Sequence, residues 1–179
     1  MGKALAFELV ECGAKKLILS GRRDDALKGL EAECKAISKD VAIHTLVCDL
    51  SDEKEVDRMA SKALELGDID ILINNGGVSS RSRYVDTLPE VDKKLMQINF
   101  LSGAALCKAV TPGMIDRGSG RIIWISSVQG LLGIPNRSSY AASKFAVQGY
   151  CESIRAELAS SGISVHTISP GYIRTNLSL

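Results

Sequence analysis

The chain of 179 residues has the length of one domain, and its hydrophobic fraction of 45% is typical of a globular protein. Its 22 basic and 21 acidic residues give a net charge of +1, which provides no electrostatic attraction toward nucleic acid or an anionic membrane. No apolar run has the length needed to cross a bilayer and no signal peptide is visible, so residues 1–179 are expected to form a single domain without a membrane segment.

The cysteines and histidines do not indicate a disulfide framework or a metal site. The five cysteines are odd in number, widely scattered and without a Cys-x-x-Cys pair, so we expect reduced and mostly buried thiols. His44 and His166 each lie in an apolar, strand-like run, and neither has a second ligand at metal-binding spacing. Both histidines are therefore predicted to be structural.

Hydrophobic periodicity predicts helices and strands that alternate along the chain. Gly13 is a candidate C-cap for the first helix, Asp52 with Glu55 is a candidate capping box for the third, and a break is expected at Pro112-Gly113. The predicted strands are Lys16–Ser20, Val41–Cys48, Ile69–Asn74, Arg121–Ile125 and Ser164–Ser169. The predicted helices are Lys3–Cys12, Asp24–Ser38, a segment from Asp52 to near Gly67, one beginning at Pro89, Asn99–Val110, and one from Tyr140 to about Ser160.

This alternation predicts an α/β fold with a doubly wound parallel sheet. Ligands of such sheets bind where the carboxyl ends of the strands meet. Polar or turn residues follow the predicted strands directly at this edge: Arg22, Asp49, Asn75, Ser127 and Pro170. We expect them to border one site.

The stretch from Arg121 to Lys144 carries the strongest chemical signal. Ser127 follows a predicted strand, and Tyr140 and Lys144 stand at positions i and i+4 of a predicted helix, so they share one face. A free tyrosine phenol has a pKa of about 10, and a nearby ammonium stabilises its phenolate. With a serine hydroxyl to hold a carbonyl or alcohol oxygen, this set suits proton transfer to oxygen while hydride reaches the neighbouring carbon. Tyr-x-x-x-Lys by itself is common and equally fits an ordinary helix surface.

Several further motifs accompany this pair in a fixed order. They are Asn74-Asn75-Gly76-Gly77, Asn99, Ser127 thirteen residues before Tyr140, Tyr140-x-x-x-Lys144 and Pro170-Gly171. In this set the chain resembles the classical short-chain dehydrogenase/reductases over nearly its whole length. Residues 126–176 look most like the branch called dehydrogenase/reductase SDR family member 7. The resemblance implies a three-layer Rossmann-type fold.

The resemblance also implies a reaction and roles for four side chains. The expected reaction is hydride transfer between a nicotinamide cofactor and a lipophilic ketone, aldehyde or secondary alcohol. Tyr140 would be the general acid/base, Lys144 would assist it and bind ribose hydroxyls, and Ser127 would orient the substrate oxygen. Asn99 would hold a helix kink and a water of the proton relay.

The resemblance and the residue types favour NADP(H), with NAD(H) possible. Family members that prefer NAD often carry an acid near the end of the second strand to hold the ribose diol, and Ser20-Gly21 offers none. Arg22 suits a 2′-phosphate instead. The positions that match family cofactor contacts are Gly2, Arg22, Asp49, Leu50, Asn75, Tyr140, Lys144, Pro170, Ile173 and Thr175.

The sequence departs from the family pattern at both ends. Of the family's Thr-Gly-x-x-x-Gly-x-Gly turn only the last glycine has a counterpart, Gly2, and the strands that come first and last in the family have none. The family's first strand lies between the counterparts of Lys16–Ser20 and Ile69–Asn74. We therefore expect a gap there, a chain that is unstable by itself, and weak NADP(H) binding. The alternative function is a catalytically silent fragment, at most a partner-binding remnant.

Association and location follow from the resemblance alone. The complete protein is expected to form a homodimer or homotetramer through the helices Asn99–Val110 and Tyr140–Ser160. Full-length relatives of this branch are anchored at the endoplasmic reticulum or peroxisomal membrane, and the residues of this chain do not assign a compartment.

Overall fold

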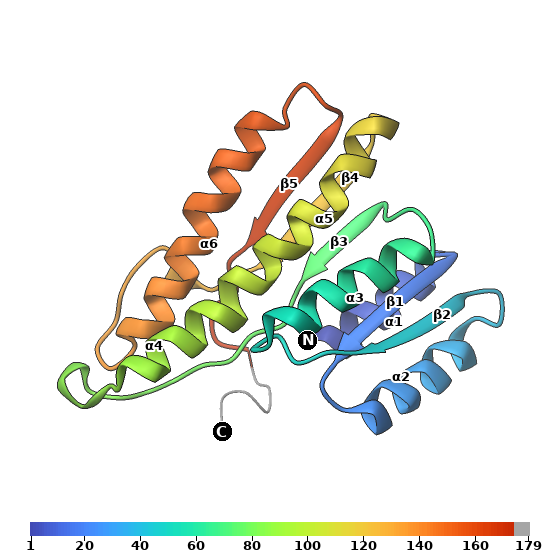
Figure 1. Ribbon diagram of the computed structural model, residues 1–179. Helices are drawn as coiled ribbons and strands as arrows, with labels where there is room; N and C mark the ends of the chain where they lie inside the picture. Colours follow the sequence, from blue (N-terminus) through green and yellow to red (C-terminus); the bar gives the residue numbers. More distant parts are fainter. Residues whose placement is uncertain (174–179) are drawn as a thin grey trace.

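The computed structural model describes residues 1–173, in which helices and strands alternate as the sequence predicts (Figure 1). The strands are β1 (Lys16–Gly21), β2 (Ala42–Val47), β3 (Ile71–Asn74), β4 (Gly120–Ile125) and β5 (Ile163–Ile168). The helices are α1 (Gly2–Glu11), α2 (Asp24–Ile37), α3 (Glu53–Glu65), α4 (Pro89–Met96), α5 (Ser102–Arg117) and α6 (Ser138–Glu157). Three short turns complete the set: the 3₁₀ turns η1 (Tyr84–Asp86) and η3 (Val128–Gly130), and the π-helical turn η2 (Gln97–Leu101). The α/β class is confirmed.

The strands form two parallel sheets that are not hydrogen-bonded to each other within residues 1–173. One sheet pairs β1 with β2, and the other has the order β3-β4-β5. β1 and β3 face each other across a cavity of about 960 Å³. The predicted gap between these two strands is therefore confirmed.

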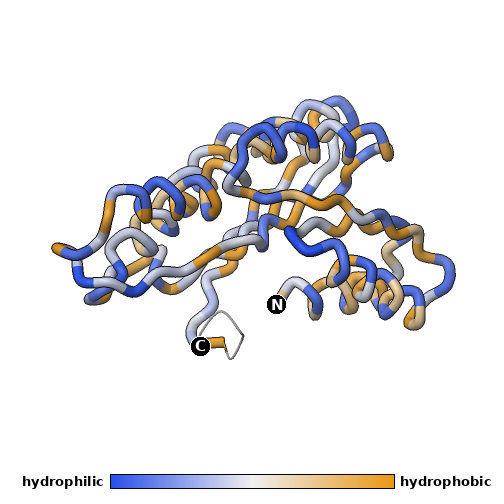
Figure 2. The backbone as a smooth tube through the Cα atoms, turned by 60° about the horizontal axis from the view of Figure 1, so that its bottom comes forward, coloured by the Kyte–Doolittle hydropathy of each residue, from blue (hydrophilic) through white to orange (hydrophobic). Residues whose placement is uncertain are grey.

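Helices cover both faces of the strands. α1 packs beside α2, while α3 packs against α5, and α4 and η2 pack against α6. Figure 2 shows apolar strands along the middle of the molecule, with the polar positions of the helices turned outward. The buried side chains fall into three clusters: one around β3–β5 with α5 and α6, one around β1, β2, α1 and α2, and a small one between α3 and α5.

Both predicted cap residues are present, but the capping box is not closed, because the amide of Asp52 donates to Asp49 O and not to the Glu55 carboxylate. Gly13 follows α1 with a φ of 87°, a conformation that glycine adopts without strain, and its N–H reaches Val10 O. Asp52 caps α3 by accepting from the amides of Lys54 and Glu55. The Glu55 carboxylate accepts from the amide of Asp49 at 2.8 Å, so it ties α3 to the end of β2.

The predicted break at Pro112-Gly113 is wrong, because α5 continues to Arg117 and ends at Gly118 with a φ of 62°. Proline removes one helical N–H, and the carbonyl that loses this donor belongs to the exposed residue Lys108. Burial of Val110 and Met114 on either side of the proline holds the helix on the sheet. Packing therefore overrides the local preference.

The expectation about apolar length is also corrected. By length and composition alone, the helical run Pro89–Arg117 could cross a membrane. Within residues 1–173 one helical run meets this criterion. In the most apolar 18-residue stretch of this run, 44% is buried inside the protein. Since the run packs on α3, α6 and the second sheet, its environment is that of a core helix.

The thiols and histidines lie in ordinary structural positions. All five cysteines are free, and burial separates Cys12, which is exposed, from the other four. His44 is half-buried in β2 and His166 is exposed in β5. No group of three side chains suited to a metal ion occurs in the part of the chain that the structure describes.

Candidate active site

The carboxyl ends of the strands place the predicted site residues along one edge. Arg22 follows β1, Asp49 comes two residues after β2, and Asn75 follows β3. Ser127 and Pro170 each come two residues after β4 and β5, and the two loops are joined where the amide of Val128 donates to Pro170 O at 3.0 Å. The N-terminus of α1 lies at the same edge (Figure 1), because a Cβ on Gly2 would come within 2.9 Å of Asn75 Nδ2.

Tyr140 and Lys144 occupy the first two turns of α6. Lys144 is only 5% exposed, and its Nζ donates to Ile125 O, the last carbonyl of β4, at 3.0 Å. The same Nζ lies 5.8 Å from the centroid of the Tyr140 ring, within the range of a cation–π contact. The predicted pair thus shares one face of the helix, with the ammonium below the phenol ring and inside the protein.

Burial has a large effect on Lys144. Removal of the ammonium from water disfavours its charged form and lowers the pKa of Lys144 to about 8. No carboxylate accepts a hydrogen bond from it in residues 1–173, and the group that does accept one is the neutral carbonyl of Ile125. The site therefore contains a buried cation with spare N–H donors.

Ser127 lies against the same turn of α6. It is the N-cap of η3, where its Oγ accepts from the amide of Gln129 at 3.2 Å. Gly130 ends this turn, and a Cβ there would meet Lys144 O at 2.9 Å. The sequence prediction missed Gly130, whose lack of a side chain allows the Ser127 loop to touch α6. A glycine three residues after the site serine is the signal that could have identified it.

Asn99 is 2% exposed and lies in the π-helical turn between α4 and α5. Its Oδ1 accepts from Val78 N at 2.8 Å, and its Nδ2 donates to Val78 O at 3.0 Å and to Ser143 Oγ at 2.9 Å. Ser143, which is fully buried, donates in turn to Tyr140 O at 2.7 Å. Asn99 therefore links the loop after β3 to the helix that carries Tyr140 and Lys144. The sequence prediction did not include Ser143.

A second loop contact was also missed. The guanidinium of Arg137, just before α6, donates to Ser79 Oγ and to Ser80 O. The amide of Ser82 donates to Asn136 O at 3.1 Å. The loops after β3 and β4 are thus fastened together beside Tyr140. An arginine in a Gly/Pro/Asn-rich loop is a weak signal, which sequence alone does not separate from a solvated side chain.

The residues predicted for the nucleotide side lie around the ends of β1–β3. Asp49 accepts from the amide and hydroxyl of Ser51, and these bonds, with a smaller contribution from the Arg22 charge, hold the pKa of its carboxyl below its usual range. Leu50 closes over Gly76, where a Cβ would lie 2.5 Å from Leu50 Cδ1. Gly76 is thus the point where the loops after β2 and β3 make contact.

The end of the described chain carries the remaining predicted residues. Ile173 is 41% exposed, and Thr175 lies outside the described residues. The structure therefore brings Asn99, Ser127, Tyr140 and Lys144 together at one end of β4, and it places Arg22, Asp49, Leu50 and Asn75 on the side of β1 and β2.

The comparison with known sequences decides the family. A sequence model described as short chain dehydrogenase matches residues 1–178. The chain belongs to this family. It is 44% identical over 183 residues to the Dehydrogenase/reductase SDR family protein 7-like of Anopheles gambiae, covering 100% of this chain and 57% of that protein. It is 44% identical over 184 residues to the Dehydrogenase/reductase SDR family member 7B of Bos taurus, covering 100% and 56%.

These relatives confirm the resemblance to the member 7 branch, and the chain spans a little over half of their length. Among solved structures, levodione reductase matches with a TM-score of 0.93 at 31% identity, over 98% of this chain and 69% of that chain. A gluconate 5-dehydrogenase from Burkholderia cenocepacia in complex with NADP and tartrate matches with a TM-score of 0.88 at 30% identity, over 99% and 70%. The Rossmann-type fold is confirmed.

The buried lysine predicts a pH dependence of stability. Because the pKa of Lys144 falls from 10.5 to about 8 on folding, the unfolded chain binds more protons between these values, and stability rises with pH there. We expect the chain to gain about 1 kcal/mol of unfolding free energy between pH 8 and 9 relative to a Lys144→Met variant. The free energy of unfolding of both proteins is measured at each pH by urea titration, with the fluorescence of Trp124 as the signal.

The comparison with the variant removes opposing contributions. Burial raises the pKa of Cys48 to about 11 and of Cys107 to about 12, so these thiols lower stability as pH rises above about 9 in both proteins. If the unfolding free energies of the two proteins changed with pH in parallel between pH 8 and 9, Lys144 would have an ordinary pKa.

Proposed function

We propose that this chain carries the catalytic and cofactor-binding residues of an NADP(H)-dependent oxidoreductase. Its substrate class is a lipophilic ketone or aldehyde, or the corresponding secondary alcohol. The observation that carries this proposal is the buried Lys144 ammonium, one turn from Tyr140 and next to the Ser127 loop, with spare donors and no carboxylate partner within residues 1–173.

The side chains present fit a nicotinamide cofactor at its two ends. Lys144 has three N–H donors and gives one to Ile125 O, so two are left for ribose hydroxyls and the phenol. A Cβ on Gly77 would lie 3.1 Å from Asn99 Oδ1 and 3.8 Å from Lys144 Nζ, so glycine leaves this approach to the ammonium open. At the other end, Arg22, Asp49 and Asn75 would hold the adenosine. When bound, the cofactor supplies or accepts the hydride.

The chain's own residues would then handle the proton. Tyr140 would give its phenolic proton to the carbonyl oxygen during reduction and take it back during oxidation. The Lys144 ammonium would stabilise the phenolate that is left. Ser127 Oγ would donate to the substrate oxygen and hold it toward the phenol. Asn99, through Ser143 and Tyr140 O, would fix the first turn of α6 in the required place.

The preference for NADP(H) rests on Arg22. Arg22 is exposed after β1, it borders the same cavity as Asp49, and Ser20-Gly21 places no carboxylate beside it. A guanidinium provides charge-assisted hydrogen bonds to a phosphate. The related gluconate 5-dehydrogenase is in complex with NADP, which supports this choice over NAD(H).

The alternative of a catalytically silent fragment has less support. A buried lysine without a carboxylate partner is costly, and the chain surrounds it with an ordered set of asparagine, serine and glycine contacts. A remnant with no reaction to perform has no need of this arrangement. Equilibrium dialysis of NADPH separates the two functions when residues 1–179 are joined to the remaining parts of the Bos taurus relative, because the silent fragment should bind no cofactor there either.

Replacement of the proposed acid tests the mechanism. In a fusion that joins residues 1–179 to the remaining parts of the Bos taurus relative, Tyr140→Phe should lower the rate of carbonyl reduction by about 10²–10⁴ while NADPH binding persists. Tyr84→Phe, at an 80% exposed tyrosine of η1, is the matched control and should leave the rate unchanged. Full turnover by Tyr140→Phe would remove this residue from the mechanism.

Replacement of the proposed phosphate ligand tests the cofactor. Arg22→Ala in the same fusion should weaken NADPH binding by roughly 10- to 150-fold, the loss of one charge-assisted contact, and should hardly affect NADH. Arg23→Ala, one residue later at the exposed N-cap of α2, is the control. Fluorescence titration gives the dissociation constants for NADPH and NADH. If Arg22→Ala weakened the binding of both cofactors equally, Arg22 would not be the ligand of the 2′-phosphate.

We also propose that the complete protein is a homodimer or homotetramer built on the α5 and α6 helices. Leu101 at the end of η2, Ile115 on α5 and Phe145 on α6 are each 45–46% exposed. Exposed apolar side chains that join into one patch are typical of partner faces. Light scattering of the fusion at micromolar concentration should give a mass of two or four chains, and Phe145→Glu should lower it. A monomer mass before mutation would contradict this proposal.

A further inference from the structure

The turn that begins at Ser127 contains a buried amide oxygen without a hydrogen bond. Gln129 lies in η3, two residues after Ser127, and is 9% exposed. Its side-chain Oε1 is fully buried and accepts no hydrogen bond from any residue that the structure describes. A buried polar atom that leaves its hydrogen-bonding capacity unused destabilises the folded chain, so a glutamine at this position needs a reason.

The chemistry of this atom determines what its partner must be. Three other buried side-chain atoms lack a hydrogen bond within residues 1–173: Trp124 Nε1, Ser126 Oγ and Thr167 Oγ1. The indole and the threonine hydroxyl lie beside the thiols of Cys107 and Cys151, which are weak partners. The serine hydroxyl can both donate and accept. The Oε1 atom of Gln129 can only accept, so its partner must be a donor.

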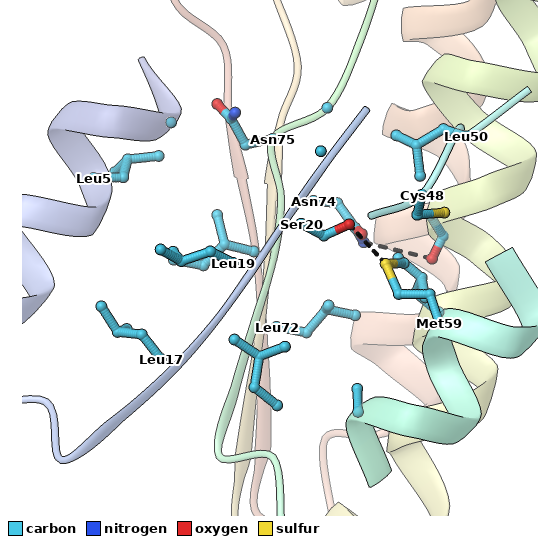
Figure 3. Close-up of a pocket in the computed structure, with 18 of the residues that line it drawn as sticks. Leu5, Leu17, Leu19, Ser20, Cys48, Leu50, Met59, Leu72, Asn74 and Asn75 are labelled. Carbon is cyan, nitrogen blue, oxygen red and sulfur yellow. Dashed lines mark hydrogen bonds between the residues drawn. The ribbon is translucent and has the colours of Figure 1, made fainter. Parts of the chain in front are cut away.

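Gln129 lies on the side of the molecule that carries Ser127, away from the large cavity. The cavity between β1 and β3 is bordered by side chains of α1, β1, α3 and β3 (Figure 3), and neither Gln129, Ser127 nor Tyr140 lines it. The backbone amide of Gln129 instead donates to Ser127 Oγ at 3.2 Å. The next residue, Gly130, brings the turn against α6, where a Cβ would meet Lys144 O at 2.9 Å.

The amide of Gln129 is within reach of a molecule held by Ser127. The backbone N of Gln129 lies 3.2 Å from Ser127 Oγ. Bond lengths of about 1.5 Å place the end of a glutamine side chain roughly 5 Å from its Cα. The side-chain amide is therefore within about 10 Å of Ser127 Oγ, a span that a few bonds of a small molecule cover.

We propose that Gln129 Oε1 accepts a hydrogen bond from a hydroxyl group of the substrate, which makes Gln129 a specificity residue for lipophilic hydroxy ketones and the corresponding diols. The inference rests on the proposed function, because it concerns the substrate that Ser127 and Tyr140 would hold. A second carbonyl has no proton to donate to Oε1. An ammonium group would be repelled by the buried cation of Lys144.

This role explains why an amide occupies a buried position in which an apolar side chain would be more stable. An Oε1 atom that stays unpaired until the substrate arrives lowers the stability of the free chain. In return, a ketone without a hydroxyl leaves the atom unpaired in the complex and binds less well. Gln129 would thus select among substrates and take no part in the transfer of the proton or the hydride.

The first test measures substrate preference in the fusion with the Bos taurus relative. The substrates are cyclohexanone and its 2-, 3- and 4-hydroxy derivatives. We expect a higher kcat/KM for at least one hydroxy derivative than for cyclohexanone. Gln129→Met keeps the length of the side chain and removes the acceptor, so this preference should fall roughly 5- to 150-fold. Gln148→Met is the matched control on α6, where the amide donates to Glu152, and should keep the preference.

The second test does not depend on turnover. Because Gln129 Oε1 has no hydrogen bond to lose, Gln129→Met should raise the midpoint of thermal unfolding by roughly 1–4 °C. Gln148→Met should not raise it. At saturation, with and without NADPH, the preferred hydroxy ketone should raise the midpoint of the unaltered fusion more than cyclohexanone does. This difference should disappear in Gln129→Met.

Three results would overturn the inference. A midpoint that does not rise in Gln129→Met would mean that the amide has a structural partner, such as a bound water. An equal change in kcat/KM for all four ketones would mean that the variant alters the turn and not the recognition of a hydroxyl. Equal thermal shifts by cyclohexanone and every hydroxy derivative would mean that no hydroxyl is recognised. If the fusion reduced none of the ketones but kept the difference in thermal shift, the proposed function would fail and this inference would stand.

Discussion

The burial of one ammonium group constrains the whole second half of the chain. Lys144 is 5% exposed beneath the end of β4, and its Nζ donates to the carbonyl of Ile125 at 3.0 Å. To bring α6 this close to β4, the Ser127 loop must turn on Gly130, where any side chain would strike Lys144 O. The position of Ser127 is thus a consequence of how Lys144 is buried.

Asn99 fixes the opposite wall of the same site. Its amide satisfies both backbone groups of Val78 and the hydroxyl of Ser143, so the loop after β3, the long helix and α6 meet at one side chain. The π-helical turn provides the geometry, because one extra residue in the turn rotates Asn99 into the interior. The irregular turn therefore has a structural purpose, because a regular α-helical turn would direct the Asn99 side chain away from Val78 and Ser143.

The order of elements and the edge of the sheet that carries the site could be predicted from sequence, because periodicity and strand ends depend on local pattern. Tyr140 and Lys144 share a helix face for the same reason. Contacts between distant segments could not be predicted: the Lys144 bond to Ile125 O, the Gly130 approach and the Arg137 link depend on how loops pack. Pro112 misled the prediction because burial of Val110 and Met114 outweighs one lost helical bond.

The two halves of the molecule are joined by helix packing rather than by a continuous sheet. A small buried cluster of Cys48, Val56 and Met59 packs on Ala105 and Leu106 of α5. Beside it, Gln97 Nε2 of η2 donates to Leu50 O at 3.4 Å. The end of β1 with its arginine and the end of β4 with its tyrosine and lysine belong to different halves. The distance between them is therefore set by the α3–α5 contact, and a molecule that spans both ends depends on this packing as much as on the groups it touches.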